Sequence, residues 1–155
     1  MKKVSATVIV LFILSISSHV FAQKSAVDKP NYQTGIGVKF YPFAVSLKTK
    51  VGVKNYMEFL GYFKDGFRLT GLYEFHGKIN EAGNVKWYLG FGGHAGFASG
   101  SQNSDVKLGA DGILGIDYKF RYLPLNLSLD WQPALGIGDD NSFTNWGGLG
   151  VRFTL

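Results

Sequence analysis

Apolar and polar side chains alternate along most of the chain from Tyr32 onward. A period of two places the apolar residues on one face of an extended strand and the polar residues on the other. In the segment 55–63 the alternation is less regular, because Leu60 and Tyr62 share a face with Glu58, and its face assignment stays open. Eight segments follow the pattern between turn-forming residues, at 32–41, 43–51, 55–63, 67–76, 85–97, 107–121, 125–132 and 143–155.

The alternation alone does not say which face is outside, since a soluble barrel buries the apolar face and a membrane barrel exposes it. Two features of the polar face favour a membrane barrel. It is rich in glycine, which suits a narrow lumen, and its charges are of both signs in near balance, which suits pairing in a buried place. The glycines are at positions 35, 37, 90, 92, 96, 109, 115, 148 and 150. We therefore predict an all-β fold, an eight-stranded antiparallel transmembrane up-and-down β-barrel.

The charges of the polar face are predicted to form a closed, paired network inside this barrel. Eight strands enclose just enough space for side chains, so we expect no large pore. The two connections 98–105 and 133–142 are predicted as the largest loops on one side. The predicted lumenal charge network is Lys39, Lys48, Glu58, Arg68, Glu74, Asp111, Asp117, Lys119, Arg121, Asp130 and Arg152.

Aromatic residues of the apolar face gather near the strand ends, as in the interfacial girdles of membrane barrels. With the strands running alternately up and down, one rim is predicted to hold Phe40, Phe43, Phe63, Phe67, Phe97 and Trp131. The other rim is predicted to hold Phe75, Trp87, Tyr118, Phe120 and Phe153.

The first 22 residues have the pattern of a secretory signal peptide. Lys2 and Lys3 precede an apolar core, and the small residues of Val20-Phe21-Ala22 form a cleavage site before Gln23. The barrel domain is predicted to span residues 23–155. Removing the two lysines of the signal lowers the formal net charge from +5 to +3, and the remaining basic residues are dispersed, so we expect no nucleic-acid partner. The chain has no cysteine, which excludes disulfides and a lipoprotein anchor.

The chain resembles the small outer-membrane β-barrel proteins of Bacteroidetes-type bacteria, and in size the OmpX and OmpA-transmembrane class. The likeness is carried by residues 108–120, by residues 124–133 and by the terminal Val151-Arg152-Phe153, although Leu155 stands where such barrels typically end in Phe. It implies a monomer in the outer membrane of a Gram-negative cell. Its implied partners are outer-membrane lipid and the barrel assembly machinery, which reads the closing strand 143–155.

No catalytic, cofactor-binding or metal site is predicted. His76 and His94 are expected to point inward as packed or hydrogen-bonded residues, and two histidines on separate strands lack metal-ligand spacing. Ser99, Ser101 and Ser104 fall in a loop with ordinary turn chemistry. Two alternatives stay open: a lipid A-modifying barrel hydrolase, and a soluble periplasmic calyx for an apolar ligand.

Overall fold

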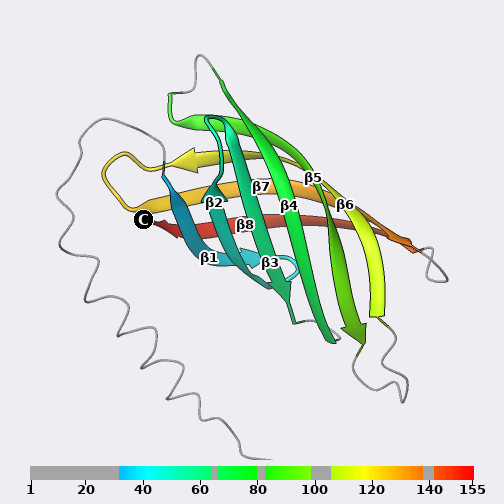
Figure 1. Cartoon of the computed structure of the whole chain (residues 1–155). Coiled ribbons are helices and arrows are strands. Elements are labelled where there is room, and N and C mark those ends of the chain that lie inside the picture. The colour runs from blue at the N-terminus through cyan, green and yellow to red at the C-terminus, as the bar shows by residue number, and fades with distance from the viewer. Residues whose placement is uncertain (1–31, 64–65, 80–82, 99–105, 138–141) are drawn as a thin grey trace, which may run out of the picture.

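The strands of the chain close into one barrel (Figure 1). The computed structural model describes residues 32–63, 66–79, 83–98, 106–137 and 142–155, and the predicted signal peptide lies outside this part. The strands are β1 (Thr34–Phe40), β2 (Ala44–Lys50), β3 (Asn55–Tyr62), β4 (Gly66–Lys78), β5 (Val85–Ala98), β6 (Val106–Lys119), β7 (Leu125–Ile137) and β8 (Phe143–Thr154). None of the described residues belongs to a helix long and apolar enough to cross a membrane.

Each strand pairs antiparallel with its neighbours in the chain, and β1 pairs with β8 to close the ring. The closing ladder runs from Gly35 opposite Thr154 to Phe40 opposite Leu149. This confirms the predicted eight-stranded antiparallel up-and-down barrel. We call the end of the barrel that holds Thr34 and Thr154 the terminal end, and the opposite end the distal end.

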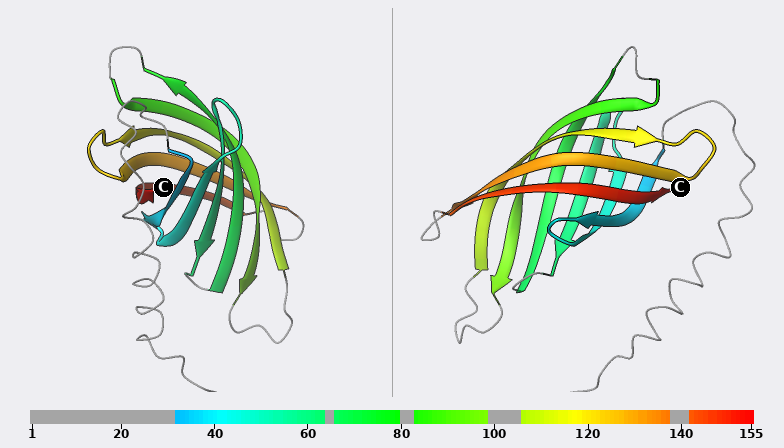
Figure 2. Two further views of the ribbon diagram at one scale, coloured as in Figure 1. Left: turned by 60° about the vertical axis from the view of Figure 1, so that its left-hand side comes forward. Right: turned by 180° about the vertical axis from the view of Figure 1, so that it is seen from behind.

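The strands differ in length around the barrel. β1 and β2 have 7 residues each and β3 has 8, whereas β4 to β8 have 12 to 14. As a result the β1–β2 hairpin stops well short of the β7–β8 hairpin at the distal end (Figure 2). Turns at the terminal end join β2 to β3, β4 to β5 and β6 to β7.

The prediction of a loop from Pro133 to Ser142 was wrong at its start, because β7 continues through Pro133 to Ile137. Proline has no N–H to donate to a neighbouring strand. The β6–β7 ladder accordingly lacks partners at positions 132 and 133, while the β7–β8 ladder keeps Pro133 opposite Asn145. One intact ladder is enough to hold the proline in the strand. Of the other predicted loop, residues 99–105 lie outside the described part of the chain.

The apolar face of the strands points outward. Phe91, Leu129 and Leu89 expose 62%, 58% and 52% of their surface, whereas Lys48 and Glu58 are fully buried. The question about β3 is settled as well, because Tyr56, Glu58, Leu60 and Tyr62 all point inward. Buried apolar side chains form a small cluster between the charged groups, consisting of Ala44, Leu60, Tyr62, Leu72, Tyr88 and Ile113.

Candidate functional site: the charged interior of the barrel

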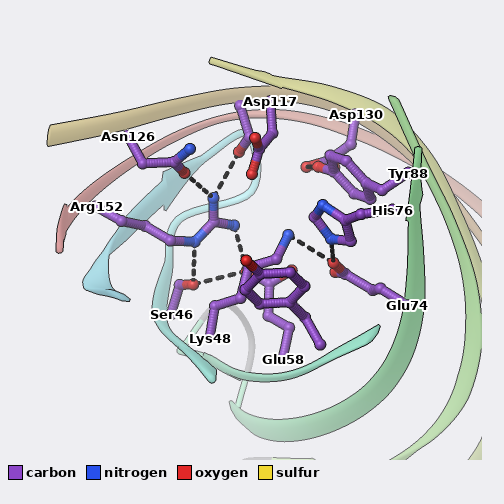
Figure 3. Close-up of polar contacts among 12 residues, drawn as sticks. Ser46, Lys48, Glu58, Glu74, His76, Tyr88, Asp117, Asn126, Asp130 and Arg152 are labelled. Carbon is purple, nitrogen blue, oxygen red and sulfur yellow. Dashed lines mark hydrogen bonds and ion pairs between the residues drawn. The ribbon is translucent and has the colours of Figure 1, made fainter. Parts of the chain in front are cut away.

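Arg152 is the hub of the interior, a fully buried guanidinium on the inward face of β8 (Figure 3). Its Nε donates to Ser46 Oγ at 2.7 Å and its Nη1 donates to Ser128 Oγ at 2.8 Å. Its Nη2 forms an ion pair with Glu58. Gly150 is the preceding inward-facing residue of β8. It leaves space for the Arg152–Ser128 contact, because a Cβ there would lie 2.3 Å from Ser128 Oγ. Arg152 thus links strands β8, β2, β7 and β3 across the lumen.

A second group surrounds Glu74 on β4, also fully buried. Glu74 Oε2 lies 2.5 Å from Lys48 Nζ and 2.8 Å from His76 Nε2. The His76 ring stacks on the Tyr88 ring with 5.1 Å between centroids, and Lys48 Nζ lies 4.1 Å from the same Tyr88 centroid. The ammonium group therefore has a carboxylate on one side and the electron-rich face of a ring on the other.

A third group lies on the Asp130 carboxylate. Lys39 Nζ is 2.6 Å from Asp130 Oδ1, and Tyr88 donates its hydroxyl to Asp130 Oδ2 at 2.7 Å. Lys39 also donates to Gln132 Oε1 at 3.2 Å, and Tyr62 donates to the same oxygen at 2.9 Å. Tyr88 belongs to both this group and the preceding one. It therefore connects the contacts around Asp130 to those around Glu74.

Toward the distal end, Asp111 on β6 gathers three donors. Arg68 Nη2 lies 2.5 Å from Asp111 Oδ1, and Gln132 Nε2 donates to that oxygen at 3.1 Å. His94 Nδ1 lies 2.6 Å from Asp111 Oδ2. The Arg68 guanidinium stacks over the Trp146 ring at 4.1 Å. Both histidines are therefore hydrogen-bonded to inward carboxylates.

At the terminal end, Asp117 meets Tyr32, which precedes β1 and turns inward. The Tyr32 hydroxyl donates to Asp117 Oδ2 at 3.3 Å. Burial and, next, the nearby Asp117 charge raise the pKa of the Tyr32 hydroxyl well above its usual value. The hydroxyl consequently remains a neutral donor at physiological pH.

The structure corrects two members of the predicted lumenal charge network. β6 ends at Lys119, whose Nζ donates to the backbone oxygens of Phe120 at 2.8 Å and Leu123 at 2.7 Å. Lys119 therefore caps the following turn instead of joining the interior. Arg121 lies past the end of the strand and is exposed, because the alternation of faces stops where the strand stops.

Sequence reasoning about charges missed the neutral members of the interior. These residues occupy the same alternate, inward-facing positions of the strands as the charged residues. That spacing is the signal in the sequence that would have identified them. The neutral residues satisfy some of the lone pairs and N–H groups that the ion pairs leave over, as buried charges require. They are Ser46, Tyr62, Tyr88, Asn126, Ser128 and Gln132. Within the described part of the chain, Glu58 Oε2, Glu74 Oε1 and His76 Nδ1 are buried without a hydrogen-bond partner. Among the described residues, no three His, Cys, Asp or Glu side chains come together as metal ligands.

Most of the predicted aromatic girdle residues lie on the outer surface near the two ends. Trp131 also faces outward, but its predicted place at a rim was wrong, because β7 continues to Ile137 and leaves it in the middle of the strand. At the distal end the Phe40 and Phe43 rings are 6.2 Å apart and the Phe63 and Phe67 rings 5.6 Å apart. Phe120 differs, being half-buried against Tyr118 at 4.8 Å beyond the end of β6. The exposed members, at 38% to 58%, are Phe40, Phe43, Phe63, Phe67, Phe75, Trp87, Phe97, Tyr118, Trp131 and Phe153.

Among solved structures, the chain is similar to the crystal structure of the N-terminal β-barrel domain of Pseudomonas aeruginosa OprF. The TM-score is 0.62 at 16% sequence identity, and the alignment covers 81% of this chain and 100% of that domain. No family model and no curated protein matches the sequence. The likeness shows that the two chains share the barrel fold, and it leaves the expected relation to Bacteroidetes proteins a prediction.

Proposed function

We propose that this chain is an integral outer-membrane barrel with a structural or interaction role and a closed, charge-paired lumen. The observation that carries the proposal is the inverted distribution of side chains. Apolar residues around the whole barrel expose 38% to 65% of their surface within the strands, whereas Lys48, Glu58, Glu74 and Arg152 are fully buried. If this outward apolar surface were in water, it would cost about 25 cal/mol of free energy for each Å² exposed. Contact with the acyl chains of a membrane removes that cost.

The interior supports a role without a large pore. The side chains of Arg152, Glu74 and Asp130 reach across the lumen to partners on other strands, and these contacts connect the distal end to the centre. Such cross-links fill the section of an eight-stranded barrel and fix the strand register. The proposal therefore assigns stability and register to the interior, and contacts with partners to the surface at the two ends.

The interior does not fit a calyx for an apolar ligand, because paired charges occupy its cross-section and the buried apolar cluster has only six members among the described residues. A lipid A hydrolase would need a serine beside one of the histidines. His76 contacts Glu74 and His94 contacts Asp111, while Ser99, Ser101 and Ser104 lie outside the described residues. No observation favours the enzyme, and we keep the non-enzymatic role.

The same proposal includes export by a cleaved signal peptide, residues 1–22, and insertion of a monomer by the barrel assembly machinery through β8. β8 is the closing strand and carries the apolar face Leu149, Val151 and Phe153 outward. Mass spectrometry of the protein recovered from cells tests the first step, with Gln23 expected as its first residue.

Fractionation combined with electrophoresis tests the location. We expect the protein in the outer-membrane fraction after a urea or carbonate wash, migrating faster unboiled than boiled because the folded barrel is compact. The matched control is the same chain denatured and held in urea, which should show one boiled-like band. Recovery in the soluble periplasmic fraction without detergent would refute the proposal.

A further inference from the structure

The barrel wall has a notch at the distal end, where β1 and β2 are too short to cover β8. β8 pairs with β7 from Phe143 onward, but its pairing with β1 begins only at Leu149, opposite Phe40. Within the described part of the chain, residues 143–148 have no backbone partner on the β1 side. Figure 2 shows the β1–β2 hairpin ending before this part of β8.

A hollow of about 520 Å³ occupies this place. It is lined by the β1–β2 turn, by the end of β3 and by the free edge of β8, through Tyr41, Pro42, Phe43, Phe63, Asn145 and Trp146. We call these six residues the notch. Asn145 lies on the outer face and accepts a hydrogen bond from Trp131 Nε1 at 2.7 Å, whereas Trp146 points into the barrel. The hollow therefore joins the outer surface to the interior.

The lining changes from apolar to polar along this path. On the outside, Tyr41, Phe43 and Phe63 expose 86%, 52% and 58% of their surface, and they continue the aromatic residues of the distal rim. At the inner end, the Trp146 ring packs 4.9 Å from the Tyr62 ring and lies under the Arg68 guanidinium. A molecule with an apolar tail and a polar head matches this order of surfaces.

The free edge of β8 points to the same kind of molecule. Unpaired backbone N–H and C=O groups are costly beside hydrocarbon, because lipid tails offer no hydrogen bonds. An ester or amide linkage of a lipid supplies donors or acceptors at the level of the aromatic girdle. An added protein strand is less suitable, since the edge spans only residues 143–148 and the rings of Tyr41, Phe43 and Phe63 line the same hollow.

We infer that the notch binds a membrane lipid. Its acyl chain lies against Tyr41, Phe43 and Phe63, and its polar linkage lies at the edge of β8 near Trp146. The inference rests on the proposed function, because a lipid reaches the notch only if the barrel stands in a membrane. The notch would give the barrel a fixed lipid partner at one position of an otherwise uniform apolar band.

The experiment uses the three tryptophans of the chain as reporters. Variants W87F/W131F and W87F/W146F keep only Trp146 or only Trp131. Each is reconstituted into vesicles of phosphatidylcholine brominated on the acyl-chain carbons next to the ester linkage, the part of the lipid that the proposal places beside Trp146. Bromine quenches tryptophan fluorescence on close contact. We expect quenching of Trp131, which faces outward, and comparable quenching of Trp146, although its side chain points inward.

A second variant closes the notch. Inserting two residues before and two after the turn 41–43 lengthens β1 and β2 without changing which side chains face inward. In the background with Trp146 alone, we expect this insertion to abolish the quenching of Trp146. The same insertion in the background with Trp131 alone should leave its quenching unchanged. Heat-dependent migration checks that every variant is folded.

The outcomes separate the two proposals. Quenching of Trp131 without quenching of Trp146 overturns the lipid notch and leaves the membrane barrel standing. Quenching of Trp146 that survives the insertion also overturns the notch. Absence of quenching in both single-tryptophan variants, with folded protein, refutes the membrane barrel itself. A bound peptide in the native mass spectrum of the detergent-extracted wild type would replace the lipid by a protein strand.

Discussion

Arg152 on β8 and Glu58 on β3 form an ion pair across the barrel, although they stand 94 residues apart in the chain. Both side chains are fully buried. The two strands are separated in the sheet by β1 and β2, so the pair bridges the lumen and does not merely reinforce a ladder between neighbours. Ser46 on the intervening β2 joins both, since it donates to Glu58 at 2.7 Å and accepts from Arg152.

Breaking this pair from one side should destabilise the barrel. Arg152→Met leaves the Glu58 carboxylate buried without its cation, and the expected loss is about 3–5 kcal/mol of unfolding free energy. The double variant Arg152→Met/Glu58→Gln should regain most of that loss, because a neutral amide needs no counter-charge. Urea titration in lipid vesicles, followed by electrophoretic mobility, measures both. Equal losses in the single and double variants would contradict the role of the pair.

Leucines of equal exposure should respond differently to a charge, depending on whether they face the proposed membrane. Leu89→Arg lies on the outer face of β5 and Leu123→Arg in the turn after β6, with exposed fractions of 52% and 51%. An arginine facing acyl chains costs about 2–4 kcal/mol near the midplane and about 0–1 kcal/mol near the interface. We expect Leu89→Arg to be the costlier change in vesicle unfolding. Equal tolerance of both would indicate that the outer face is in water.

Two glycines should differ sharply in their tolerance of alanine. A Cβ on Gly37 would lie 1.9 Å from the backbone oxygen of Val151, which cannot move without disturbing the β1–β8 closure. A Cβ on Gly71 would meet the Phe59 ring at 3.7 Å, an ordinary contact. We expect Gly37→Ala to cost about 1–3 kcal/mol or more by overpacking and Gly71→Ala to change stability by less than about 0.5 kcal/mol. The folded fraction after refolding into detergent checks the order of the two.

The filled lumen predicts little ion flux. In planar bilayers we expect no large, steady current from the wild-type barrel, because side chains on β2, β3, β4 and β8 meet in its cross-section. Arg152→Ala removes the side chain that reaches Ser46, Glu58 and Ser128 at once, and should raise the current above the wild-type level. A steady ohmic conductance of the unmodified protein would argue for an open channel instead.

Much of this molecule follows from the order of its residues alone. The period of two defines strands and assigns faces locally, since successive side chains of a strand point to opposite sides. This was sufficient for the barrel, for its outward apolar face and for the inward position of Arg152, Glu74 and Asp111. The prediction failed where a strand boundary was misplaced, at Pro133 and Arg121, because the end of a strand depends on pairing with a neighbour and not on its own pattern.

The partners of the inward charges and the shape of the wall were decided only by the closed barrel. Which cation meets which carboxylate depends on the stagger of all eight strands, so no local pattern could join Arg152 to Glu58 or His94 to Asp111. The notch likewise arises from a difference in length between β1 and β8, two strands at opposite ends of the chain that become neighbours only on closure. Alternation is a local property, whereas pairing across a lumen is a property of the whole ring.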